Sequence, residues 1–93
     1  MKNKNVIKIR KKLDKLDDQF LKIIKKRTIL VDQVIRNKKY KKDIIDKKRI
    51  KIILKNIKKK SLSRNIDTKI TYKIWSEMIK AYIDYEYRNF KKK

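Results

Sequence analysis

Apolar residues at helical spacing dominate the first third of the chain. They recur at alternating intervals of 4 and 3 residues and form one stripe along a long helix. The stripe predicts a helix from about Asn5 to Asn37, which at ~1.5 Å per residue is about 50 Å long. The rest of the chain is too short to cover such a helix, so we expect it to form a dimer. The stripe consists of Ile9, Leu13, Leu16, Phe20, Ile23, Arg27, Leu30 and Val34.

Two shorter helices follow. The apolar periodicity breaks after the first helix, where Asp43 or Asp46 is available to cap a second helix over residues 47–60. Residues 61–66 then supply a loop, and Asp67 is suited to cap a third helix. The pattern predicts an all-α fold of three helices in a single domain over the whole chain, residues 1–93. The side chains expected to point inward are Ile50, Ile53, Leu54, Ile57, Ile70, Ile74, Trp75, Met78, Ile79, Tyr82, Ile83 and Phe90.

Arg27 is the one charged member of the apolar stripe. A guanidinium stays protonated in proteins, and its unpaired burial is expensive, so it calls for a carboxylate or an anionic ligand. A structural alternative is that the side chain reaches water with its stem along apolar surface. A second alternative is that it pairs with Glu86, which shares a face of the third helix with Tyr82 and Ile79. Three surroundings of the Arg27 guanidinium therefore remain open, namely a bound anion, the Glu86 carboxylate and water.

The composition excludes several kinds of chemistry. The chain has no cysteine and no histidine, so disulfides, thiol chemistry, the usual zinc sites and histidine acid–base catalysis are excluded. It also has no glycine and no proline. It therefore lacks the residue that most readily adopts positive φ in tight turns and the residue that most sharply ends a helix. No segment has the length of a signal peptide or a membrane span, which predicts a cytoplasmic protein.

The formal charge of +22 would ordinarily indicate nucleic acid or an anionic membrane as a partner. Lysine, however, occupies nearly every polar position, a bias that AT-rich codon usage alone produces, and a charge run is usually a solvated face. A basic helical nucleic-acid-binding module remains an alternative function, and it would need exposed aromatics among clustered cations. The aromatic residues on apolar stripes are instead Phe20, Trp75, Tyr82 and Phe90. The candidates for exposure are Tyr40, Tyr72, Tyr85 and Tyr87.

Four basic residues form a candidate anion site: Arg10, Arg27, Lys38 and Arg49. Arg10 and Arg27 are 17 residues apart, which is roughly 25 Å along one helix. They therefore cannot both hold one small anion from the same chain. An antiparallel partner helix would bring a second copy of Arg10 to the site.

The spacings of these residues resemble the AroQ-class chorismate mutases, which are small all-helical homodimers. Ile9–Asp17 resembles the family's opening "hRxxIDxLD", and Arg27 and Lys38 follow at the family's intervals. Residues 46–49, Asp-Lys-Lys-Arg, resemble the family's "DPxR". Residues 74–90 resemble the "hW…hI…YE.R.F" ending of a proteobacterial branch that is close to the isochorismate pyruvate lyases. The resemblance covers nearly the whole chain.

The resemblance implies the Claisen rearrangement of chorismate to prephenate, a step of the shikimate pathway toward Phe and Tyr, without cofactor or metal. Such an enzyme holds a dicarboxylate in a compact chair and stabilises charge on the ether oxygen. It also implies an intertwined homodimer with two sites, each built across the subunit boundary. By the family pattern, Arg27 and the partner subunit's Arg10 clamp the carboxylates. Lys38 donates to the ether oxygen and a carboxylate, and Arg49 supports the substrate or neighbouring acidic groups.

Three positions depart from the family pattern. Ile50 replaces a Glu that receives the substrate hydroxyl, Tyr82 replaces a Ser, and Glu86 stands where Gln is common. To donate to the ether oxygen Glu86 must be protonated; burial favours that form, whereas nearby Lys38 and Arg27 favour the carboxylate. Glu86 is thus either a proton-bearing donor or an acceptor that tunes Lys38. We predict Lys38, Arg27 and Glu86 as catalytic residues and Tyr82 as a substrate contact.

Isochorismate pyruvate lyase is the alternative activity on the same fold. Ile50, Tyr82 and the loop length from Lys38 to Arg49 resemble the lyases, which eliminate pyruvate from isochorismate to form salicylate. The same set of cations serves both reactions. The mutase is favoured because the ending around Glu86 resembles the mutase branch, and because most organisms that make Phe and Tyr need the mutase step.

Overall fold

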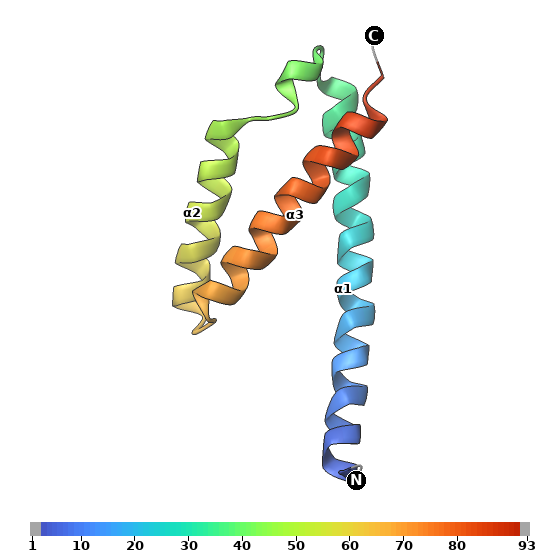
Figure 1. Ribbon diagram of the computed structural model, residues 1–93, viewed down its shortest axis with the longest axis vertical. Helices are drawn as coiled ribbons and strands as arrows, with labels where there is room; N and C mark the ends of the chain where they lie inside the picture. Colours follow the sequence, from blue (N-terminus) through green and yellow to red (C-terminus); the bar gives the residue numbers. More distant parts are fainter. Residues whose placement is uncertain (1–2, 92–93) are drawn as a thin grey trace. The chain divides into compact units, whose positions relative to one another are not determined.

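The computed structural model describes residues 3–91 and contains three α-helices and one short 3₁₀-helix (Figure 1). The helices are α1 (Lys4–Asn37), α2 (Lys47–Ser63) and α3 (Thr68–Asn89), and the 3₁₀-helix η1 (Lys41–Asp43) lies between α1 and α2. No strand occurs within residues 3–91. The predicted all-α class with three helices and a long first helix is confirmed.

The chain divides into two compact units, Met1–Asp32 and Gln33–Lys93. The described part of the first unit is a stretch of α1 alone. The second unit holds the last residues of α1 together with η1, α2 and α3. The single domain expected over residues 1–93 stays a prediction.

The first unit exposes the apolar stripe of α1. The helix begins beside Asn3, whose side-chain oxygen accepts hydrogen bonds from the backbone N–H groups of Asn5 at 2.8 Å and Val6 at 3.4 Å. A single helix has no second element to cover its apolar face, so the stripe expected to face a core is open to solvent within this unit. The exposed members are Ile9, Leu13, Leu16, Phe20, Ile23 and Leu30.

In the second unit α2 and α3 pack on each other as a hairpin (Figure 1). The hairpin is joined by a buried hydrogen bond of 2.8 Å between the hydroxyls of Ser61 and Thr71. The prediction of a loop from residue 61 was wrong, since α2 continues to Ser63. Its serines donate to the backbone of the preceding turn, Ser61 to Ile57 at 2.6 Å and Ser63 to Lys60 at 2.9 Å, so their hydroxyls are satisfied inside the helix.

Asn65 ends α2 in the absence of glycine. Its φ is 56°, and asparagine tolerates this left-handed conformation better than most residues. The Ile66 N–H donates to the Ser61 carbonyl at 2.9 Å and the Asn65 N–H to the Leu62 carbonyl at 3.3 Å. These two bonds form a Schellman motif. Asn65 thus makes the positive-φ turn that a glycine usually makes at the end of a helix.

The N-caps of α2 and α3 are aspartates that the sequence analysis named as candidates. Asp46, rather than Asp43, caps α2 by accepting from the Arg49 N–H at 3.0 Å. Asp67 caps α3 by accepting from the Lys69 N–H at 2.8 Å. Both starts therefore lie where the sequence indicated.

Burial in the second unit is modest. Ile35 and Ile44 are its buried apolar residues, and the predicted inward residues of α2 are half-buried. The prediction was wrong for Ile70 and Ile74, which are exposed in the single chain. The α3 side chain that meets α2 at this end of the hairpin is Thr71, through its hydrogen bond with Ser61. The other predicted inward residues of α3 are half-buried, and so is Phe90, which directly follows the helix. The half-buried residues of α3 are Trp75, Met78, Ile79, Tyr82 and Ile83.

Candidate functional site

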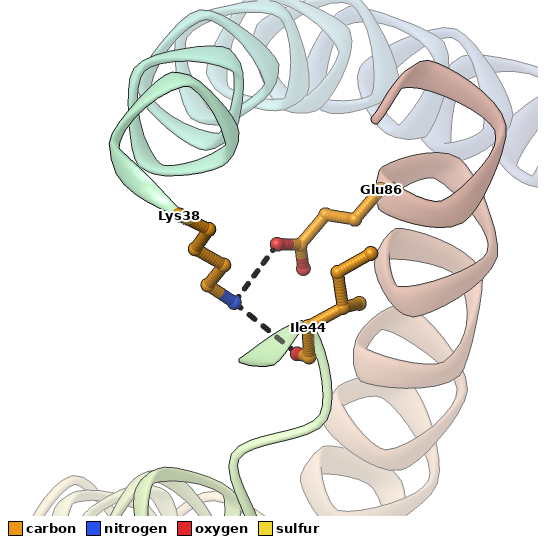
Figure 2. A network of polar contacts seen from close by, with 3 residues as sticks. All are labelled: Lys38, Ile44 and Glu86. Atoms are coloured by element: carbon orange, nitrogen blue, oxygen red, sulfur yellow. Dashed lines mark hydrogen bonds and ion pairs between the residues drawn. The ribbon is translucent and has the colours of Figure 1, made fainter. Parts of the chain in front are cut away.

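Lys38 forms the centre of the candidate site. It follows α1 directly, and its Nζ donates to Glu86 Oε1 at 3.1 Å and to the backbone carbonyl of Ile44 at 3.2 Å. Figure 2 shows the three residues converging from the end of α1, the loop before α2 and the last part of α3. Lys38 and Glu86 are 48 positions apart in the sequence, so the fold alone brings them together.

The segment between α1 and α2 provides the second acceptor for the Lys38 ammonium, the Ile44 carbonyl. After Lys38 the chain turns through η1, where the Asp43 N–H donates to the Tyr40 carbonyl and the Ile44 N–H to the Lys41 carbonyl. This turn brings the Ile44 carbonyl back toward the Lys38 ammonium. The sequence predictions missed this group, although two adjacent isoleucines, Ile44 and Ile45, in a segment rich in lysine and aspartate are a signal of an anchored loop.

The Lys38–Glu86 pair is largely withdrawn from water. The side chains are 20% and 12% exposed, against 63% and 68% for Arg88 and Asp84 in another ion pair of the second unit. Lower local polarity strengthens the interaction of Lys38 with any charge placed beside it. An ammonium has three N–H donors, and two of them are engaged. The arrangement can therefore offer one directed, charged donor to a ligand.

Tyr82 and Arg49 lie in the same unit as this pair. Tyr82 is one turn before Glu86 on α3, is half-buried, and meets Tyr85 edge to face at 6.3 Å between ring centres. Arg49 lies in the first turn of α2 and is exposed. Within residues 3–91 the Arg49 side chain makes no hydrogen bond or ion pair with Lys38 or Glu86.

The two remaining predicted residues, Arg10 and Arg27, lie on α1 in the first unit, and both are exposed. Their separation of 17 residues corresponds to ~25 Å along the helix. The structure therefore joins Lys38 with Glu86 and does not join Arg10 with Arg27. The six predicted residues are thus divided between the two units, with Arg10 and Arg27 in the first and the other four in the second.

A groove of about 540 Å³ lies elsewhere, between α2 and α3, and none of the predicted site residues lines it. Its lining is mostly apolar with lysines among it, and it includes no carboxylate. Within residues 3–91 no group of three or more acidic residues is placed to hold a metal ion. The lining residues are Leu54, Lys55, Ile57, Lys58, Thr68, Lys69, Thr71 and Tyr72.

The fold and the site define an all-helical protein whose candidate chemistry rests on the oriented ammonium of Lys38. A comparison with protein families matches residues 9–87 to chorismate mutase type II, and the chain belongs to this family. It is a chorismate mutase, an enzyme of the isomerase class in aromatic amino acid biosynthesis. A search of curated proteins found no match, and neither did a search of solved structures. No helix of the described part of the chain is long and apolar enough to cross a membrane.

Proposed function

We propose that this chain rearranges chorismate to prephenate at a site centred on Lys38. The observation that carries the proposal is the Lys38 ammonium, held by Glu86 Oε1 at 3.1 Å and the Ile44 carbonyl at 3.2 Å. The reaction needs no covalent intermediate, so the protein must only position the substrate and stabilise charge as the ether bond breaks. A directed charged donor and a set of guanidinium groups supply both.

Each predicted residue then has a defined role. Lys38 donates its third N–H to the ether oxygen, where negative charge develops in the transition state. Arg27 and the partner subunit's Arg10 bind the two carboxylates, since a guanidinium matches a carboxylate with two parallel hydrogen bonds. Arg49 supports the substrate from the first turn of α2, and Tyr82 lines the site one turn from Glu86.

For Glu86 we favour the role of an acceptor that tunes Lys38. The support is that Glu86 accepts a hydrogen bond from Lys38 across part-buried surroundings. As an acceptor, Glu86 holds the ammonium without itself contacting the ether oxygen. We then expect Glu86→Gln to leave the shape of the pH–activity profile unchanged. A profile that falls with rising pH in the parent and becomes flat in Glu86→Gln would instead assign the proton-bearing donor.

The site is completed by a second copy of the chain in this proposal. The exposed stripe of the first unit, and the ~25 Å between Arg10 and Arg27 along α1, both support an intertwined homodimer. Two α1 helices packed antiparallel would bury both stripes and return the partner's Arg10 toward Arg27. Each dimer then has two equivalent sites.

A complementation experiment tests the shared site. Arg10→Ala and Lys38→Ala are prepared separately and then refolded together. Each homodimer lacks a required group at both sites, whereas half of randomly mixed dimers carry both variants and have one intact site of two. Activity should therefore return to about a quarter of the parent level. Absence of any return after verified mixing would show that each site draws Arg10 and Lys38 from one chain.

The substrate is tested by incubating the parent protein separately with chorismate and with isochorismate. Prephenate from chorismate is the expected product. Salicylate as the faster product would instead assign the chain to the isochorismate pyruvate lyases, whose pattern has residues like Ile50 and Tyr82. We also propose that the chain belongs to the proteobacterial branch whose C-terminal ending residues 74–90 resemble. Loss of neither substrate would overturn the proposal and return attention to the charge of +22; steep salt dependence of duplex binding would then indicate a nucleic-acid module. The cytoplasmic location stays a prediction.

A further inference from the structure

Ile44 is held at three points. Its N–H donates to the Lys41 carbonyl at 3.2 Å, the residue as a whole is only 3% exposed, and its carbonyl accepts from Lys38 at 3.2 Å. Its neighbour Ile45, of identical composition, is 44% exposed. Figure 2 shows the Ile44 carbonyl directed at the Lys38 ammonium beside Glu86. The loop is therefore anchored by one isoleucine of the pair and not by the other.

Two acceptors determine where the Lys38 ammonium points. Its three N–H bonds are tetrahedral, so fixing two of them on Glu86 and Ile44 fixes the direction of the third. A lysine side chain otherwise has four rotatable bonds and little preference for one position. Because the donors that stabilise a transition state act best when already oriented, the second acceptor has a direct consequence for reactivity.

The chemical type of the second acceptor also matters. Glu86 brings one negative charge beside the ammonium, and a second carboxylate would repel a dianionic substrate at short range. A backbone carbonyl orients the ammonium and carries no net charge. The Ile44 carbonyl therefore directs Lys38 while leaving its positive charge available to the substrate.

We infer that Ile44 is a positioning residue of the mutase reaction, whose buried side chain anchors the loop so that its carbonyl aims the Lys38 ammonium at the breaking ether bond. The inference rests on the proposed role of Lys38. It predicts an effect on the transition state more than on substrate binding, because charge on the ether oxygen develops only as the bond breaks.

The first test compares Ile44→Ala with Ile45→Ala. Ile44→Ala should lower kcat about tenfold with KM changed less than threefold, since a small misplacement of a reacting group has a large effect on rate. Ile45→Ala should stay within about twofold of the parent, and so should Ile44→Val, which retains most of the buried side chain. Circular dichroism at the assay temperature corrects each rate for the folded fraction. Equal kcat values for Ile44→Ala and Ile45→Ala would overturn the inference.

A double-mutant cycle separates positioning from general damage. If Ile44 acts through Lys38, adding Ile44→Ala to Lys38→Ala should lower the residual rate by less than about twofold. A further tenfold loss in the Lys38→Ala background would show that Ile44 acts through the structure as a whole. If Lys38→Ala by itself retained parent activity, the site assignment and this inference would both fail. A Lys38→Ala loss with no effect of Ile44→Ala would refute only the inference.

A backbone variant keeps the test valid if Ile44→Ala does not fold. Replacing Ile45 by its α-hydroxy acid converts the Ile44 carbonyl to an ester carbonyl, which is a weaker acceptor, and leaves every side chain in place. The Ile45 N–H that is lost donates to no group within residues 3–91, so the change is confined to the carbonyl. We expect a three- to tenfold lower kcat with an unchanged melting temperature. An unchanged kcat would overturn the inference.

Discussion

The two units of this chain treat charge and apolar surface in opposite ways. In the second unit a lysine and a glutamate are part-buried, hydrogen-bonded and held by elements distant in sequence. In the first unit Arg10 and Arg27 lie exposed on a helix whose apolar stripe is also exposed. The second unit therefore orients its polar groups through its own packing. Under the proposal above, a second copy of the chain would bring Arg10 and Arg27 to one site, since 17 positions separate them along a single helix.

The largest expected effect comes from placing a charge on the exposed stripe of the first unit. Leu16→Glu should abolish the dimer and all activity, because burying an unpaired carboxylate opposes association by several kcal/mol, and ~1.4 kcal/mol is a tenfold change in affinity. Leu62→Glu in the second unit is the matched control, since Leu62 and Leu16 are 61% and 57% exposed. Sedimentation velocity measures both variants. A dimeric, active Leu16→Glu would remove the distinction between the units.

The next effect tests Arg27 itself. Arg27→Ala should lower kcat/KM by about 100- to 1,000-fold, because it would remove the guanidinium proposed to bind a substrate carboxylate, and losing one partner of such a hydrogen-bonded charge pair costs about 2–5 kcal/mol. Helix content should not change, because Arg27 is exposed on α1. Lys26→Ala, at the adjacent exposed position, is the control and should stay within about twofold. Activity near the parent level in Arg27→Ala would show that the first unit supplies no cation to the site at position 27.

A smaller effect is expected from removing the Ser61–Thr71 hydrogen bond, which tests whether the second unit is stabilised by hydrogen bonds of its own. Ser61→Ala should lower the free energy of unfolding by about 1–3 kcal/mol, because the Thr71 hydroxyl loses its buried partner. Replacing both residues, with Thr71→Val added, should restore part of that loss. Urea denaturation gives the three values, and kcat should remain at the parent level. Simple additivity of the two changes would mean that the hydroxyls contribute independently.

The smallest effect contrasts two ion pairs of the second unit. Asp84→Asn breaks the exposed pair with Arg88, whose Nε lies 2.7 Å from Asp84 Oδ2, and should lower the free energy of unfolding by at most about 0.5 kcal/mol. Glu86→Ala removes the partner of part-buried Lys38 and should have a clearly larger effect. Both are measured by urea denaturation at two salt concentrations. Equal effects would argue that burial does not distinguish these pairs.

Much of the fold follows from local patterns in the sequence. The spacing of apolar residues located α1 to within a residue, and Asp46 and Asp67 marked the starts of α2 and α3, because caps and periodicity depend on neighbours along the chain. The end of α2 was placed too early. Serines favour loops in general, whereas Ser61 is held in the helix by hydrogen bonds to the Ile57 carbonyl and to the Thr71 hydroxyl.

Some features of the candidate site could likewise be predicted from the sequence, and others could not. The spacings of Arg10, Arg27, Lys38 and Arg49 were readable from the sequence and were enough to indicate the family to which the chain belongs. The family resemblance already placed Glu86 near Lys38, and the structure shows the hydrogen bond between them. The bond from Lys38 to the Ile44 carbonyl was not readable, because no local preference specifies a contact with a backbone group of a loop. Residue types, helix positions and chemical class were thus determined by the sequence itself. Which charges meet, and which backbone carbonyl orients the Lys38 ammonium, depends on the packing of separate helices, because burial and direction arise only there.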